Sequence, residues 1–386
     1  MHPTRVERLH AAHARFGDQA DRVAAFLNVC DPLADACVDA FAELPAGRGF
    51  ELVSRAIADG IDRVPDAPPA LRALFASLDR VPAWVDWDVV DRGGELLLRS
   101  GPLGAMVLGF RSLVIAYAAP GGNKPLVLSG RLTDNAGRRL AETGRYVHEV
   151  ARPRSLRRDG EGFAITVKVR LMHAQVRRLV RRSGKWQSDA WGEPVNQHDM
   201  LGTALVFSVA MIDGLRQLGF RLSDDEVHGY IQLWRYASHL MGLDHELLFS
   251  TEREGRRLGD IIAALQGPPD EDARALVAAL FSSGLGDPKS RAEAIFLRGY
   301  RRFVQGLSRG FVGDELADGV ALPDDLSRYA LPAIRPIVRV AERVRERSEI
   351  ARRVAIFAGN ERWKRVVRAG LGDAPAEFRP PERLAR

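Results

Sequence analysis

The sequence predicts an all-α fold, and three observations support that prediction. Apolar residues recur at helical spacing along most of the 386 residues, so that segment after segment has one apolar face. Alternation with a period of two is scarce, and Leu126–Leu128 is the best candidate for a short extended segment. Glycine and proline separate the helical segments, at residues 65–69, 120–123, 267–269 and 332–336.

Three predicted helices come first, at residues 20–44, 47–61 and 69–79. Four follow, at residues 86–99, 102–119, 133–151 and 162–182. The other six are predicted at residues 197–219, 224–242, 252–265, 270–283, 288–307 and 331–357. We divide the chain into an N-terminal helical cap (1–85), a central core (86–265), C-terminal helices packed on that core (266–372) and a flexible tail rich in proline and charge (373–386).

Two of these helix starts carry capping signals. Ser223 stands three residues before Glu226, which is the spacing of a capping box ahead of a long amphipathic run. Asn196 has the residue type that caps a helix, and we expect it to begin the helix that contains Asp199 and Thr203.

Composition narrows the function classes. With 46% hydrophobic residues the chain can build a substantial core, which excludes general disorder. The formal net charge is +6, but only five of the 56 basic residues are lysines. An arginine excess of this kind often reflects a GC-rich genome, so we do not predict nucleic-acid binding. The arginines at 177, 178, 181 and 182 are expected to form a solvated helix face.

Nothing in the N-terminal or apolar segments predicts export or a membrane span. Residues Met1–Gln19 contain charges and histidines where a secretory signal has an apolar core, so we expect a cytoplasmic protein. The apolar stretch Gly101–Ala119 has Arg111 near its centre, which favours a buried helix and leaves peripheral membrane contact as an alternative. Cys30 and Cys37, placed on one predicted helix, make neither a disulfide framework nor a four-cysteine zinc site.

The most informative residue is His173. On a helical wheel it shares a face with Val169, Val176 and Val180, while the neighbouring arginines occupy other faces. Such a helix offers what an axial haem ligand needs: a neutral nitrogen donor, an apolar wall for the porphyrin, and nearby cations for the propionates. The alternative is a core histidine that is hydrogen-bonded to a backbone carbonyl.

Two further segments would have to meet this helix. In the predicted helix 133–151, Arg139 lies one turn before Thr143, so that the guanidinium and the hydroxyl can point to one place. Alternatively, Arg139 is a helix-edge charge and Thr143 bonds back to its own helix. In the later pair of long helices, aromatic, sulfur-containing or small side chains suit a flat cofactor but also an ordinary core: Thr203, Phe207, Met211, Trp234 and Met241.

A set of motifs in fixed order resembles the catalytic-domain family of latex clearing protein, or rubber oxygenase. The family also includes the membrane-associated oxygenase that cleaves a farnesyl chain in fungal mycophenolic acid biosynthesis. The resemblance covers about residues 85–260. It is carried by Arg170-Leu-Met-His-Ala-Gln-Val-Arg177, Trp191-Gly-Glu-Pro-Val-Asn-Gln-His-Asp199, Thr203 with Phe207-Ser208, and Tyr230-Ile-Gln-Leu-Trp-Arg-Tyr-Ala-Ser-His-Leu-Met-Gly-Leu243.

The resemblance implies a haem b protein with a globin-like helical core, in which His173 matches the proximal iron ligand. Arg139 and Thr143 match the arginine and threonine beside the haem, and Thr203 is expected to contact the cofactor. The implied activity is oxygenation, in the simplest case cleavage, of a C=C bond in a hydrophobic, isoprenoid-like substrate by dioxygen. Arg139 would stabilise negative charge or hold a propionate, and Thr143 would donate a hydrogen bond to the bound oxygen.

The sequence departs from the polyisoprene-cleaving members at two places. Glu142 stands where those members carry a lysine between the arginine and the threonine, and we consider it a candidate base or proton shuttle, with an exposed glutamate as the alternative. The glutamate that those members place about twenty residues upstream has no counterpart in Ala119–Lys124. Rubber itself is therefore a doubtful substrate.

Two other functions stay open from the sequence. A haem protein could bind oxygen or serve redox sensing without turnover. A metal-dependent phosphohydrolase could use His173, His198 with Asp199, and Asp225 or Asp244 as ligands. Further candidate ligands are His228, His239 and His245, of which His239 is most simply structural.

Overall fold

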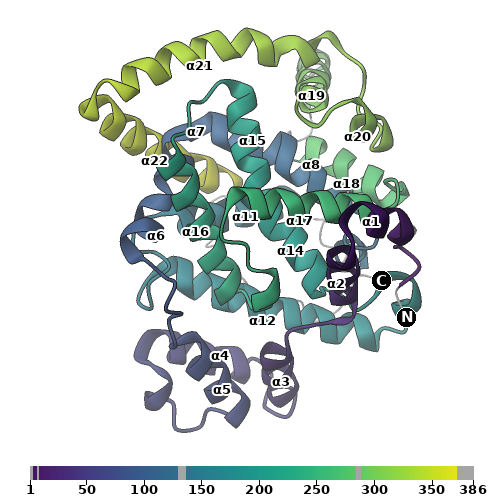
Figure 1. The fold of residues 1–386 in the computed structure, drawn as a ribbon, viewed down its shortest axis with the longest axis vertical. Coiled ribbons are helices and arrows are strands. Elements are labelled where there is room, and N and C mark those ends of the chain that lie inside the picture. Colours follow the sequence, from purple (N-terminus) through teal and green to yellow (C-terminus); the bar gives the residue numbers. More distant parts are fainter. Residues whose placement is uncertain (1–2, 7, 129–135, 284–287, 372–386) are drawn as a thin grey trace.

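The computed structural model describes residues 3–6, 8–128, 136–283 and 288–371, and every regular element in these ranges is a helix (Figure 1). The prediction of an all-α fold is confirmed. One continuous apolar core runs from Ala12 to Trp363, so the outer helices share it with the central ones. The predicted tail at 373–386 lies outside the described residues.

The N-terminal part contains α1 (Leu9–Phe16), α2 (Asp18–Ala25), α3 (Pro32–Phe41), α4 (Arg48–Asp59) and α5 (Pro69–Leu78). The predicted helix 20–44 is therefore wrong in its length. Asp31 accepts a hydrogen bond from the backbone nitrogen of Ala34 at 3.2 Å, and Pro32 occupies the first turn, so a new helix begins there. Cys30 lies in the connection and only Cys37 is helical.

Next come α6 (Trp87–Gly93), α7 (Glu95–Val107), a π-helical turn at Leu108–Ser112, α8 (Leu113–Tyr117) and α9 (Lys124–Leu128). Helix α7 is kinked where Gly101 takes φ +52°, a conformation that favours glycine, just before Pro102. The extended segment predicted at Leu126–Leu128 is wrong. The backbone nitrogens of Leu126 and Val127 both donate to the carbonyl of Asn123, which turns this segment into a short helix.

The central helices are α11 (Ala136–Ala151), α12 (Glu161–Arg182), α13 (Ser188–Trp191), α14 (Gln197–Phe207), α15 (Val209–Leu218) and α16 (Asp224–Leu240). Both predicted caps are confirmed: Asn196 accepts from Asp199, and Ser223 and Glu226 form a complete capping box. The predicted helix 197–219 is broken at Ser208, whose backbone leaves the helical region.

The C-terminal helices are α17 (Glu252–Leu265), α18 (Glu271–Ser282), α19 (Arg291–Val312), α20 (Asp314–Gly319), α21 (Ala330–Glu346) and α22 (Glu349–Leu371). The helix predicted at 331–357 is in fact two, because Ser348 accepts from the nitrogen of Ala351 and starts α22. Helix α22 packs against α7 and α11. Gly359 allows this close approach, since a Cβ there would lie 1.8 Å from the carbonyl oxygen of Leu98.

The solvated arginine face that the sequence predicted on α12 is correct only in part: Arg181 and Arg182 are exposed, whereas Arg177 is buried and Arg178 is half-buried. Arg177 is 2% exposed and donates to Asp35 at 2.7 Å and to the carbonyl of Val195 at 2.7 Å. Arg178 pairs with Asp39 at 3.2 Å. Helix α3 lies against this side of α12 and supplies the carboxylates. Because these charges are already paired, Arg177 and Arg178 are not the free cations that we expected beside a haem propionate.

Two helical stretches in the described ranges are long and apolar enough to cross a membrane, Trp87–Tyr117 and Gln197–Leu218. Half of the first apolar window and 72% of the second are covered by other parts of the protein. In the first stretch, Arg111 donates to the carbonyls of Ala210 and Phe311 at 3.1 and 2.5 Å. These are the contacts of a packed helix, as the sequence predicted for Gly101–Ala119.

Candidate active site

The central helices enclose a cavity of about 300 Å³. Its walls come from α8, α9, α11, α12, α14 and α16, and most of the wall is apolar. The lining includes four of the predicted site residues on α11 and α12, and Thr203 on α14: Arg139, Glu142, Thr143, His173 and Thr203. The structure therefore brings together the three segments that the sequence singled out.

His173 projects from the middle of α12 into this wall, between Val169 and Val176 on the same helix face. Its Nδ1 atom is buried and has no hydrogen-bond partner. Burial, and to a lesser degree Arg177 and Arg139, lower the pKa of the imidazole to about 4. The ring is therefore neutral at neutral pH, and the bond from Nδ1 to a backbone carbonyl that would mark an ordinary core histidine is missing.

Helix α11 contributes the charged part of the wall. Glu142 is 9% exposed and lies between two guanidinium groups, 3.4 Å from that of Arg138 and 3.9 Å from that of Arg139. Burial lowers the pKa of Arg139, and Glu142 opposes that shift. The i, i+3 and i, i+4 spacings place all three side chains on one side of the helix. A buried carboxylate and a cation thus face the cavity together.

Thr143 also lines the cavity, but its hydroxyl is engaged. Oγ1 donates to the carbonyl oxygen of Arg139 at 3.0 Å. Thr203 repeats this arrangement on α14, where its Oγ1 donates to the carbonyl of Asp199 at 2.9 Å. Thr143 therefore has the back-bonded arrangement that was the alternative from the sequence, and Thr203 has the same arrangement. In this state each hydroxyl has only acceptor capacity left for a ligand.

Another part of the lining consists of aromatic and methionine side chains. The rings of Phe207 and Trp234 stack with centroids 5.2 Å apart, and Tyr146 meets Trp234 edge-on at 6.2 Å. Met241 also lines the cavity, whereas Met211 is fully buried in the core away from it. The resulting surface suits a flat or extended apolar ligand.

Sequence reasoning missed one charged pair at the cavity. The carboxylate of Asp199 belongs to the lining, and Arg5 from the N-terminal segment binds it with two hydrogen bonds of 2.9 and 3.0 Å. Asn196 donates to the same carboxylate at 2.9 Å. The predicted helix start at Asn196 places Asp199 in the first turn of α14. Arg5 lies 194 residues from Asp199 in the sequence, and no local pattern indicates that the two residues pair.

The other histidines lie outside the cavity lining. His198 is buried and its Nδ1 contacts the carbonyl of Val23 at 3.1 Å. His239 stacks on Tyr236 with centroids 6.1 Å apart, as expected of a structural residue. His228 and His245 are exposed.

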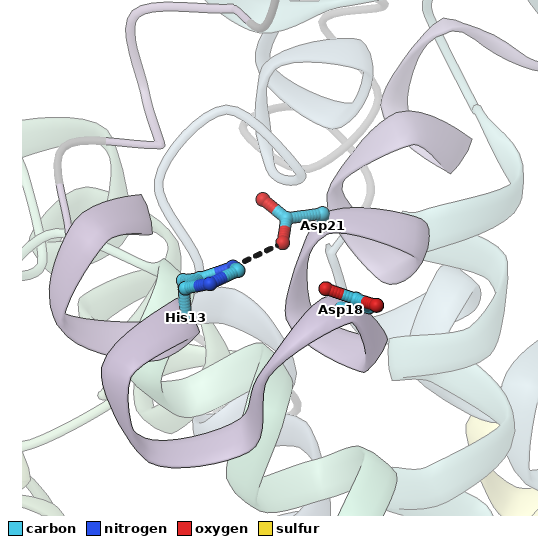
Figure 2. A group of neighbouring side chains, drawn as sticks. All are labelled: His13, Asp18 and Asp21. Atoms are coloured by element: carbon cyan, nitrogen blue, oxygen red, sulfur yellow. Dashed lines mark hydrogen bonds and ion pairs between the residues drawn. The ribbon is translucent and has the colours of Figure 1, made fainter.

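The residues proposed for a phosphohydrolase do not assemble. In the described part of the chain, side chains grouped closely enough to share a metal ion are His13 with Asp18 and Asp21, and Asp244 with His245 and Glu246. Figure 2 shows the first group, in which the His13 ring points to Asp21 and forms a short hydrogen bond with it. That bond raises the pKa of His13. Neither group includes His173, His198 or Asp199.

Known proteins share both the sequence pattern and the architecture. Residues 97–343 match the family described as ER-bound oxygenase mpaB/B'/rubber oxygenase, catalytic domain. Rubber oxygenase of Streptomyces sp. (strain K30) is 25% identical over 186 residues, which are 48% of this chain and 46% of that protein.

A solved structure of latex clearing protein in its closed state superposes with a TM-score of 0.68. The superposition covers 87% of this chain and 88% of the latex clearing protein chain, and the two sequences are 21% identical. The similarity therefore supports the fold. The family match spans well over half of the chain and includes the helices that carry Arg139, Glu142, Thr143 and His173. The chain belongs to the mpaB and rubber oxygenase catalytic-domain family, a family of oxygenases.

Proposed function

We propose that this protein is a haem b-dependent oxygenase that oxidises, and in the simplest case cleaves, a C=C bond of a hydrophobic, isoprenoid-like substrate with dioxygen. Family membership supports oxygenase chemistry in general. The single observation that carries the cofactor assignment is His173, a half-buried neutral imidazole whose buried Nδ1 has no partner, set in the wall of an apolar cavity.

The residues present fit a haem. A neutral imidazole is the protonation state that binds iron, and Val169 and Val176 flank it with apolar surface. Phe207 and Trp234 offer flat faces in another part of the lining. Arg139 supplies a cation for a propionate, in place of the arginines of α12 that are tied to α3. When bound, the haem iron would supply the activation of dioxygen, which no side chain can provide.

The side chains of this chain then have separate tasks. His173 would hold the iron, and Arg139 would hold a carboxylate or stabilise negative charge in the cavity. Glu142 would accept or return a proton at its carboxylate, which the nearby guanidinium groups of Arg138 and Arg139 hold at the cavity wall. Thr143, whose hydroxyl is bonded to its own helix, would contribute surface to the cavity wall. The aromatic wall would align the apolar substrate and exclude water.

The departures from the polyisoprene-cleaving pattern point to a different substrate. The segment Ala119–Lys124 has no carboxylate, and the nearest one at the cavity, Asp199, is fully engaged by Arg5 and Asn196. A Cβ on Gly122 would lie 3.1 Å from Asp199, so this loop and α14 touch at the cavity. We therefore propose a smaller isoprenoid than rubber as the substrate.

An absorption spectrum and an oxygen-uptake assay test the proposal together. The purified protein should show a Soret band and one haem b per chain, and His173→Ala should lose both. His239→Ala is the control, because His239 lies outside the cavity and should leave the haem content unchanged. With a reductant and a panel of isoprenoids, the haem protein should consume oxygen and yield carbonyl products.

Two results would contradict the proposal. Full haem occupancy in the His173→Ala variant would show that His173 is not the iron ligand. A haem protein that consumes no oxygen with any isoprenoid would instead support a non-catalytic role in binding oxygen or in redox sensing.

A further inference from the structure

Helix α21 is amphipathic, and its apolar face is exposed on the surface of the molecule. Its inward face carries the buried carboxylate of Glu342, which accepts two hydrogen bonds of 2.9 Å from Arg99 on α7. Its outward face carries Ile337, Val340 and Val344, which are 72%, 58% and 58% exposed. These three residues recur at helical spacing, so they form one continuous apolar stripe on the surface.

The stripe continues into the next helix. Ile350, Val354 and Phe357 in the first turns of α22 are 77%, 59% and 69% exposed and again follow helical spacing. Figure 1 shows α21 running along one edge of the molecule and α22 descending from its end. Soluble proteins rarely expose an apolar surface of this extent unless something binds there.

The same two helices have a strongly positive net charge. Residues 330–371 contain eleven arginines and lysines and four glutamates, a formal net charge of +7, whereas the whole chain carries +6. All four glutamates already pair with arginine or lysine: Glu342, Glu346, Glu349 and Glu361. In the described ranges, exposed arginines without an ion pair remain on both helices and in the connection between them: Arg339, Arg343, Arg347, Arg362, Arg365 and Arg368.

We propose that α21 and the start of α22 form a docking face for the surface of an anionic lipid bilayer. An apolar stripe bordered by unpaired arginines is the pattern of helices that lie in the membrane interface, with apolar side chains among the acyl chains and cations at the headgroups. A second copy of the chain fits less well, because a symmetric pairing would bring the same cationic face against itself.

Vesicle co-sedimentation of the full chain tests this inference. The protein should bind vesicles of phosphatidylcholine and phosphatidylserine more tightly than phosphatidylcholine alone, and added salt should weaken the binding. The triple variant Arg339→Gln, Arg343→Gln, Arg347→Gln should lower partitioning by about tenfold or more. The triple variant Ile337→Ser, Val340→Ser, Val344→Ser should lower partitioning to both kinds of vesicle.

A matched control removes three exposed, unpaired arginines elsewhere: Arg63→Gln, Arg80→Gln, Arg182→Gln. Arg63 precedes α5 and Arg80 follows it, and that helix lies at the opposite end of the molecule from α21 (Figure 1). The control should bind like the unmodified protein, and all variants should keep its circular dichroism spectrum and melting temperature.

Three results would overturn the inference. One is failure of the unmodified protein to bind anionic vesicles. Another is an equal loss of binding in the control. The third is a dimer in light scattering that the apolar variant converts to a monomer, which would identify the face as a contact between copies. None of these measurements depends on haem content or turnover, so the proposed oxygenase function can fail or stand separately.

Discussion

Arg170 and Asp31 form a buried two-point ion pair that ties the helix of His173 to the N-terminal part of the chain. Nε and one terminal nitrogen of Arg170 donate to the two carboxylate oxygens at 2.6 and 2.9 Å. The same carboxylate accepts from the nitrogen of Ala34 and caps α3. Asp31 thus caps α3 and at the same time pairs with Arg170 on α12.

Asp31→Ala should be strongly destabilising. The variant leaves the charge of Arg170 buried without its partner and removes a helix cap, which together should lower the free energy of unfolding by about 3–5 kcal/mol. Urea denaturation measures this loss. Asp39→Ala is the control, because its pair with Arg178 is solvent-exposed and should cost less than about 1 kcal/mol. Equal losses in both variants would contradict the assigned role of Asp31.

Gly359→Ala should separate α22 from α7. The added methyl group would meet the Leu98 carbonyl at 1.8 Å, and a backbone atom cannot move aside without displacing its helix. We expect a loss of about 3 kcal/mol or more in the free energy of unfolding. Gly299→Ala provides the comparison, because that glycine lies in α19 with open space around it. There the alanine should raise stability by up to about 1 kcal/mol.

Acid should destabilise the protein through His198. Burial lowers the pKa of its imidazole to about 4, whereas an unfolded histidine titrates near 6.5. Between these values the unfolded state binds more protons, so stability falls as the pH drops from about 6.5 to about 4. We expect the unmodified protein to lose about 2 kcal/mol more than His198→Gln between pH 7 and pH 5.

The measurement is urea denaturation at the two pH values. His245→Gln is the control for the replacement of a histidine as such, since the side chain of His245 is exposed and the substitution removes no buried imidazole. If His198→Gln and the unmodified protein lose the same stability on acidification, the imidazole of His198 is not held neutral in the fold.

Thr143→Val should leave oxygen uptake within about threefold of the unmodified enzyme. The hydroxyl is bonded to its own helix, so its removal takes no donor away from the cavity. Arg139→Gln should slow uptake by about tenfold or more, because it removes the cation that faces the cavity beside Glu142. Oxygen-electrode rates, normalised to haem content, distinguish the two. A severe loss with Thr143→Val would restore the donor role that the sequence suggested.

Local patterns were sufficient for most helices and for the placement of a few residues that line the cavity. Helical spacing places His173 on one face with its valines and Arg139 one turn before Thr143, whereas their expected roles beside a cofactor came from the resemblance to the family. The capping residues Asn196 and Ser223 also act within one turn of chain and were predicted correctly. Sequence reasoning is reliable where cause and effect lie within a few residues.

The wrong predictions concern residues whose environment is set by parts of the chain that are distant in sequence. Arg177 was expected in solvent because nothing in its own helix indicates that α3 covers it with Asp35. The pairing of Asp199 with Arg5 at the cavity went unrecognised because the two residues are 194 positions apart in the sequence. Leu126–Leu128 has the composition of a strand, but no other strand in the described ranges is available to pair with it.

The packing of α22 behind α11 has a consequence for the order in which the protein matures. Helix α11 carries Arg139, Glu142 and Thr143, yet its rear surface is covered by the last described helix of the chain. During synthesis α22 begins to emerge from the ribosome 198 residues after the end of the helix it supports, from Ala151 to Glu349. The pocket therefore reaches its final shape only after residues 349–371 have been synthesised, so we expect a prosthetic group to be held stably only from that point on.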